Sequence, residues 1–156
     1  MSFLERISDN GYEVLASLIV TNFSAQLIKT IIYSIRNKHV DLPMLFHTGG
    51  MPSSHSASVV AMSTSIGLID GFDSIQFALA FCLSSVVMYD SAGVRRSAGK
   101  QAEVLNTIVE ELFSKSHKIS KSKLRELLGH SPKEVLVGAI FGIGVSFALR
   151  YWLSYA

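Results

Sequence analysis

Apolar residues gather into four long blocks that are separated by polar connections. The blocks run from about Tyr12 to Ile35, from about Ser56 to Ile69, from about Ile75 to Ala92 and from about Glu134 to Tyr155. A helix that crosses a bilayer needs roughly 17–25 residues, so the first, third and fourth blocks are long enough. The second block reaches that length only if its helix begins near Pro52. The pattern predicts a polytopic bundle of about four membrane helices.

Small residues indicate where these helices pack closely. In the second block they are Ser56, Ala57, Ser58, Ala61, Ser63, Ser65 and Gly67. In the fourth block they are Gly138, Gly142 and Gly144. Small side chains let membrane helices approach one another, so we expect both blocks to contribute to helix–helix contacts.

The long third connection carries a different pattern. Ala102, Leu105, Ile108, Val109 and Leu112 recur at helical spacing, and the opposite face is polar. This predicts an amphipathic helix from about Gly99 to Phe113, along the membrane surface or over a site. A further helical turn is expected from Leu124 to Leu128. The connection would then hold one or two helices.

Composition supports a membrane protein. Of the 156 residues, 49% are hydrophobic and only 17% are charged, whereas about 25% charged residues are usual in soluble domains. The alternative is a soluble, all-helical core. The length predicts one domain over residues 1–156. Cys82 cannot form an internal disulfide and is expected to be buried.

Basic residues predict the orientation. With four spans, the first and third connections share one side of the membrane. The third connection holds nine Lys and Arg against four acidic residues. Positive charge favours the cytoplasmic side, so we expect a multi-pass protein of the bacterial cytoplasmic membrane with both termini outside. The net charge of +2 gives no indication of a nucleic-acid partner.

The stretch Thr48–Ala57 combines two glycines, Pro52, three serines and His55 ahead of an apolar run. This predicts a loop that leads into a helix, with Pro in the first turn and Ser as a cap. Free amides and the helix dipole make such a terminus suitable for phosphate. His55 adds a proton donor or acceptor near neutral pH, although it could serve only as a helix-capping residue.

The predicted topology brings four polar clusters to one membrane face. They are Lys29 to Arg36, Pro52 to His55, Asp90 to Arg96 and Gly129 to Glu134. Cations and helix amides bind phosphoryl groups, and two histidines can act as nucleophile and general acid. No metal-ligand pattern is evident, so we expect phosphoryl transfer without a metal or other cofactor.

Several of these residues have simpler alternatives. Lys29 shares a helix face with Asn22 and Gln26, but it could snorkel toward the helix end. His130 could be a loop histidine. Asp90 is expected to pair with Arg95 or Arg96 rather than to act in catalysis.

Three segments resemble the type 2 phosphatidic acid phosphatase (PAP2) superfamily, which includes vanadium-dependent haloperoxidases. More closely, they resemble its divergent bacterial and plastid branch. The segments are Thr48–Ala57, Tyr89–Arg96 and Leu128–Val135. The resemblance covers nearly the whole chain and implies a PAP2/haloperoxidase-like all-α core.

The superfamily's three motifs occur in the expected order, with changes. Lys29 and Arg36 match the first motif, but Asn37 replaces its Pro. Pro52, Ser53 and His55 match the second, with Ser54 in place of Gly. His130 and Glu134 match the end of the third, with Glu for Asp. The third-motif arginine position holds Leu124. Arg125 follows one residue late, and Arg95 or Arg96 could substitute for it.

The resemblance implies a role for each matching residue. His130 would attack phosphorus and form a phosphohistidine, Glu134 would orient its ring, and His55 would protonate the leaving oxygen. The phosphate oxygens would be held by Lys29, Arg36, Ser53 and the amide of Ser54, together with one of Arg95, Arg96 or Arg125.

We therefore expect an integral membrane phosphatase of the acid phosphatase type, acting on a lipid or prenyl phosphate or diphosphate. The alternative is an inactive binder or transporter of phosphorylated lipid, and a haloperoxidase is less favoured. The expected partners are membrane lipid and the phosphorylated lipid. Typical relatives have six core helices, so a homo-oligomer could complete the bundle.

Overall fold

The computed structural model describes residues 7–39, 50–113 and 129–155, which contain five helices and no strand. They are α1 (Gly11–Asn37), α2 (Ser54–Asp70), α3 (Ile75–Ala92), α4 (Val94–Phe113) and α5 (Pro132–Tyr155). The predicted all-α bundle is confirmed. The four apolar blocks became α1, α2, α3 and α5, and each boundary lies within two residues of its prediction.

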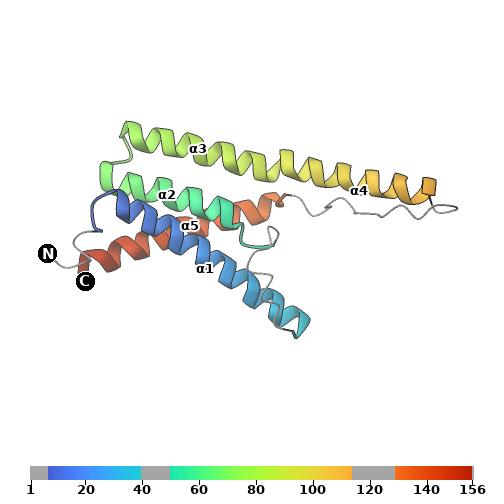
Figure 1. The fold of residues 1–156 in the computed structure, drawn as a ribbon. Coiled ribbons are helices and arrows are strands. Elements are labelled where there is room, and N and C mark those ends of the chain that lie inside the picture. The colour runs from blue at the N-terminus through green and yellow to red at the C-terminus, as the bar shows by residue number, and fades with distance from the viewer. Residues whose placement is uncertain (1–6, 40–49, 114–128, 156) are drawn as a thin grey trace.

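Helix α2 lies at the centre of the bundle, where it contacts α1, α3 and α5 (Figure 1). Its Ser, Ala and Gly residues are mostly buried. With 17 residues it extends over about 26 Å at 1.5 Å per residue, which is shorter than the other helices of the bundle. Three described segments are long and apolar enough to cross a membrane, namely Gly11–Asn37, Ile75–Val109 and Pro132–Tyr155.

Two glycines of α5 allow its backbone to touch α2. A Cβ atom at Gly138 would lie 2.5 Å from the Ser53 carbonyl oxygen, and one at Gly142 would lie 2.3 Å from that of Ala57. Both distances are too short for any side chain. The predicted packing role is therefore confirmed for these two glycines. It is wrong for Gly144, because a Cβ atom there would meet no atom within 4 Å.

A stripe of α1 is buried along its whole length against α2 and α5. Its members lie four residues apart and are Glu13, Ser17, Thr21, Ala25 and Lys29. One turn after Glu13, the Ser17 hydroxyl lies 2.8 Å from that of Ser146, which donates to the Ala61 carbonyl at 2.9 Å. These bonds join α1, α2 and α5 deep in the bundle.

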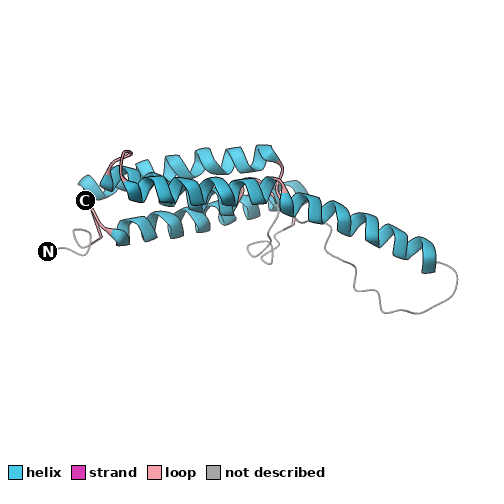
Figure 2. Cartoon of the chain, turned by 90° about the horizontal axis from the view of Figure 1, so that it is seen from above, coloured by secondary structure: helices cyan, strands magenta, loops and turns pink. Residues whose placement is uncertain are grey.

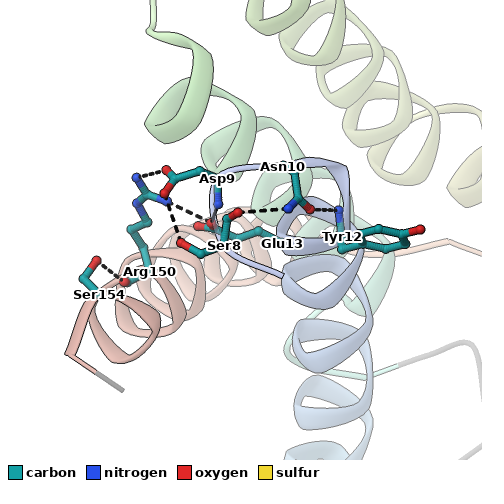
Figure 3. A network of polar contacts seen from close by, with 7 residues as sticks. All are labelled: Ser8, Asp9, Asn10, Tyr12, Glu13, Arg150 and Ser154. Atoms are coloured by element: carbon teal, nitrogen blue, oxygen red, sulfur yellow. Dashed lines mark hydrogen bonds and ion pairs between the residues drawn. The ribbon is translucent and has the colours of Figure 1, made fainter. Parts of the chain in front are cut away.

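The two chain ends meet at one end of the bundle, where α1 begins and α5 finishes (Figures 1 and 3). There Arg150 donates to Glu13 Oε2 at 2.8 Å and to Asp9 Oδ1 at 2.5 Å. Asn10 caps α1 by accepting from the amide of Tyr12. The hydrogen bond from Arg150 lowers the pKa of the Asp9 carboxyl below its usual value of 3.8. We call Asp9, Glu13 and Arg150 the terminal ion cluster.

Helix α4 continues from α3 after the single residue Gly93 and projects beyond the bundle (Figures 1 and 2). It starts at Val94 rather than at Gly99, because the chain remains helical on both sides of the glycine. Among the described helices it contacts α3 alone, so the expectation that it covers the site is wrong for the described residues.

Helix α3 is the most outward of the bundle helices, and only Ala80, Ser84 and Ser91 are buried on it. Cys82 is exposed on this helix, contrary to the prediction. The reason is that α3 packs against the bundle only through the narrow face that carries Ala80, Ser84 and Ser91. Cys82 lies outside this face and is therefore exposed. The turn predicted at Leu124–Leu128 lies outside the described residues.

Candidate functional site

The ends of four helices meet at the end of the bundle opposite the terminal ion cluster. The His130 amide donates to the Ser91 carbonyl at 3.0 Å, which ties the start of α5 to the end of α3. The Ser53 amide donates to the Glu134 carbonyl at 3.2 Å, which ties α2 to α5. The topology predicted from the apolar blocks therefore places the second and third motifs side by side.

His130 and Glu134 form a fixed pair at the start of α5. His130 Nδ1 lies 3.0 Å from Glu134 Oε2. The same carboxylate oxygen accepts from the Ser131 amide at 3.1 Å, and the Ser131 hydroxyl accepts from the Glu134 amide at 3.4 Å. This reciprocal arrangement is a capping box. Glu134 therefore caps the helix and holds the histidine ring with one oxygen.

This pair sets the chemistry available to His130. When Nδ1–H donates to the carboxylate, Nε2 keeps its lone pair and can act as a nucleophile. A carboxylate at this distance would also stabilise a positive charge on the ring. His130 is buried, with only 3% of its surface exposed.

His55 lies in the first turn of α2, facing the same region. Its ring centroid is 6.4 Å from that of His130, and the two rings are tilted by 55°. The ring is half-buried. Two imidazoles this close together could act as nucleophile and general acid in one reaction.

The serines before His55 serve different purposes. Ser53 is fully buried and caps α2, since its hydroxyl accepts from the amide and the hydroxyl of Ser56. The Ser54 hydroxyl accepts from Lys29 Nζ at 3.4 Å. The contacts of Ser53 and Ser54 with phosphate remain predictions.

Lys29 points into the bundle. Only 2% of its surface is exposed, and it bonds Ser54 on α2, so the snorkelling alternative is wrong. Asn22, seven residues earlier, donates to the Ser58 hydroxyl at 3.1 Å. The polar face predicted for α1 therefore packs against α2. A buried cation is costly unless an anion or dipoles offset it, which is typical of a functional position.

A cavity of about 290 Å³ lies beside these residues. Two cations, Lys29 and Arg36, line it with one carboxylate, Glu134. The remaining lining residues are Ile32, Tyr33, Gly50 and Met51. Lys29 and Arg36 of the first motif thus share one cavity with Glu134 of the third, and we call it the phosphate cavity. The two cations against one carboxylate leave a net charge of +1, which favours an anion.

Three predicted residues are not placed. Arg125 lies outside the described residues, and Arg95 and Arg96 are in the first turn of α4, where only the backbone is described. The residue that replaces the third-motif arginine therefore remains a prediction. Within the described ranges, no group of three His, Cys, Asp or Glu side chains could hold a metal ion.

Ser91 and Tyr33 lie within two of the polar clusters predicted to meet, but sequence reasoning gave neither of them a role. Ser91 anchors His130 through its backbone carbonyl, which any residue type provides, so its identity carries no signal for this contact. Tyr33 lies one turn before Arg36 on α1. Its position between the two first-motif cations is the signal that could have placed it at the cavity.

Comparisons with known proteins identify the family of the chain. The divergent PAP2 family matches residues 11–145 of the chain. The uncharacterized membrane protein YuiD of Bacillus subtilis strain 168 is 41% identical over 152 residues, which cover 91% of this chain and 96% of YuiD. No solved structure matches. A family match over most of the length, with the motif residues meeting at one end of the helices, shows that the chain belongs to the divergent PAP2 family of membrane proteins.

Proposed function

We propose that the chain is an integral membrane phosphatase that hydrolyses a lipid or prenyl phosphate or diphosphate through a phosphohistidine. One observation carries the proposal. A carboxylate-oriented histidine and a second histidine lie together at the end of membrane helices, beside a cationic cavity. A membrane lipid carries its phosphate where membrane helices end, so a lipid phosphate is the substrate class that we propose.

The reaction proceeds in two steps. His130 Nε2 attacks phosphorus, the new P–N bond forms, and the bond from phosphorus to the leaving oxygen breaks as His55 donates its proton to that oxygen. Water then attacks the phosphohistidine, giving a proton to His55, and the P–N bond breaks to release phosphate. Each residue returns to its starting state, so the two steps close a catalytic cycle.

The charges support this sequence. Lys29 and Arg36 compensate the negative charge on the phosphoryl oxygens, and the amides at the start of α2 add their dipoles. Glu134 compensates the positive charge that develops on His130. The proposal thus assigns each ionised group at the cavity to one stage of the transfer.

The burial of His130 favours a second candidate. Its ring is almost fully covered and does not line the phosphate cavity, whereas Glu134 does. A protein that binds or moves a phosphorylated lipid without cleaving it would need the cationic cavity but no access to the ring.

A phosphate-release screen separates the two candidates. The purified protein in detergent is given phosphatidic acid, farnesyl phosphate and farnesyl diphosphate, with and without vanadate. A phosphatase releases phosphate from at least one of them, and vanadate inhibits it because it mimics the transferring phosphoryl group. Tight binding of these lipids with no release supports the binder and contradicts the phosphatase.

We also propose that the site faces the cytoplasm and that both termini lie outside, because the third connection is rich in Lys and Arg. The termini lie at the opposite end of the bundle from the site (Figure 1). A phosphatase reporter fused to Ala156 should be active in cells and a green fluorescent reporter should be dark. The reverse result would overturn this orientation.

A further inference from the structure

Helix α4 has an apolar side that no described helix other than α3 approaches, because α4 projects beyond the bundle (Figure 2). Successive residues of a helix are rotated by about 100°, so the large apolar residues of α4 that are described as exposed fall within an arc of about 140°. No charged residue of α4 falls within this arc. We call these residues the apolar side of α4, and they are Val94, Val104, Leu105, Ile108 and Val109, each 40–60% exposed.

This side begins where a helix of membrane length ends. Helix α3 has 18 residues and rises about 27 Å at 1.5 Å per residue, close to the roughly 30 Å of a bilayer core. The candidate span that contains α3 runs from Ile75 to Val109, and its 35 residues would rise about 52 Å if straight. This is far more than the core requires. Helix α4 therefore starts at the membrane surface, and the nearest apolar medium to it is the bilayer interface.

The direction of α4 is set at one residue. Only Gly93 separates α4 from α3, and its backbone is not helical, with φ −107° and ψ −81°. Among the described residues, no contact with α1, α2 or α5 holds α4 in its projecting direction. A rotation about the two backbone dihedral angles of Gly93 can therefore lay α4 along the membrane surface.

Exposed lysines lie at the same end of the bundle as α4. Lys38 caps the end of α1, Lys100 belongs to α4 and Lys133 lies in the first turn of α5. The α2–α3 turn at the opposite end carries two exposed acidic residues, Asp70 and Asp73. Basic residues at a membrane surface attract anionic lipid headgroups. The charges therefore favour an anionic surface at the end where α4 begins.

We propose that α4 lies on the bilayer surface, with its apolar side at the boundary between headgroups and acyl chains and the exposed lysines on anionic headgroups. A second copy of the helix is a poorer partner, because a two-stranded coiled coil buries only a narrow seam. Val104 and Val109, at the two edges of the arc, would remain in water, whereas a flat lipid surface covers both. The inference does not rest on phosphatase activity.

A matched pair of labels tests the inference in the full chain. Leu105 is on the apolar side, and Glu103 lies about 200° from it on the polar side. Each is replaced by Cys in a Cys82→Ser background, labelled with a fluorophore and placed in nanodiscs of phosphatidylcholine and phosphatidylglycerol. Lipid with a nitroxide near its headgroup should quench the label at Leu105→Cys at least threefold more than that at Glu103→Cys. Aqueous iodide should show the reverse preference.

The other possible surroundings of α4 give different results. Equal quenching of both labels by iodide would place α4 in water and overturn the inference. A label at Leu105→Cys that neither quencher reaches would show that protein covers the apolar side, which also overturns it. Disulfide cross-linking of unlabelled Leu105→Cys would then identify a second copy as the cover, and its absence would identify the chain's own bundle.

The contribution of the lysines is tested by substitution. Lys100→Gln combined with Lys133→Gln should lower lipid quenching at Leu105→Cys at least twofold in nanodiscs that contain phosphatidylglycerol, and leave it unchanged in phosphatidylcholine alone. Asp70→Asn, at the opposite end, is the control and should change neither. Equal quenching in anionic and neutral lipid would overturn the role of the headgroups. Phosphatidylglycerol is a phosphodiester without a terminal phosphate, so the result is independent of whether the chain releases phosphate.

Discussion

At the end that carries both termini, Arg150 bonds Asp9 and Glu13 directly, whereas at the other end Lys29 and Arg36 line a cavity. The terminal ion cluster has one cation and two carboxylates, a net charge of −1. The phosphate cavity has two cations and one carboxylate, a net charge of +1. Both ends bury charge on the same stripe of α1, because Glu13 and Lys29 are both nearly covered.

We propose that the charges of the terminal ion cluster stabilise the fold, whereas those of the phosphate cavity bind a ligand. Arg150 joins the first turn of α1 to the end of α5 through contacts of 2.5 and 2.8 Å, so its charge is used within the protein. The cations of the phosphate cavity surround a volume that a phosphate can enter. Substitutions at the two ends should therefore affect different measurements.

The largest expected effect is the loss of phosphate release in His130→Ala. Removal of the nucleophile should lower kcat by about 10³-fold or more, as for other catalytic groups that act as a unit. The control is His39→Ala, since His39 is an exposed histidine just after α1. Phosphate release is measured for both purified variants. Retained activity in His130→Ala would contradict its role.

The next largest effect comes from replacing one cation at each end of the bundle, Lys29 in the phosphate cavity and Arg150 in the terminal ion cluster. Lys29→Met should lower kcat/KM by about 10²–10³-fold, comparable to the loss of one transition-state donor. The melting temperature should hold or rise, because a buried cation is removed.

Arg150→Met should show the opposite pattern. It leaves Glu13 buried without its cation, so the free energy of unfolding should fall by about 2–4 kcal/mol, somewhat below the cost for a fully buried pair. Activity per folded molecule should be unchanged. Thermal unfolding in detergent and phosphate release are measured on both variants. If both variants lose stability and activity to the same extent, the proposed difference between the two ends is wrong.

A smaller effect is expected at the α2–α5 contact that supports the site. Gly142→Ala places a Cβ atom 2.3 Å from the Ala57 carbonyl oxygen, so the helices must separate. Unfolding should become easier by about 1–3 kcal/mol. Gly144→Ala is the matched control, because that position is open and Ala favours the helix. Equal melting temperatures for the two variants would show that the close approach is unimportant.

The smallest effect is the pH dependence of the terminal ion cluster. Arg150 lowers the pKa of Asp9, so the folded protein binds that proton less tightly than the unfolded chain. The stabilisation is present above the usual pKa of 3.8 and is lost as the pH falls through the lowered value. Because Asp9 is exposed, it amounts to at most about 1 kcal/mol.

Asp9→Asn should accordingly lower the melting temperature slightly at neutral pH and leave it unchanged near pH 2. The melting temperature of both proteins is followed across this range. If the two melting temperatures differ as much near pH 2 as at neutral pH, the charge of the Asp9 carboxylate is not the cause of the difference.

Much of the fold could be predicted because apolar blocks of membrane length fix helices such as α1 and α5 almost to the residue. The meeting of Lys29, His55 and His130 also followed, since antiparallel spans return alternate ends to one face. Contacts made by the backbone, such as Ser91 to His130, could not be predicted. Neither could the terminal ion cluster, because Asp9, Glu13 and Arg150 are far apart in the sequence and have no motif.

Helix α3 shows a further limit. Its apolar composition predicted a helix of membrane length correctly but could not distinguish a buried position from an exposed one, so the burial predicted for Cys82 was wrong.

The central claim is that His130 carries the phosphoryl group. The most direct test mixes the purified protein with farnesyl phosphate, quenches the reaction with alkali, which preserves phosphohistidine, and maps the modified peptide by mass spectrometry. The account predicts phosphate on His130 in the wild-type protein and none in His130→Ala. Phosphate release with no phosphate on His130, or with phosphate on another residue, would contradict it.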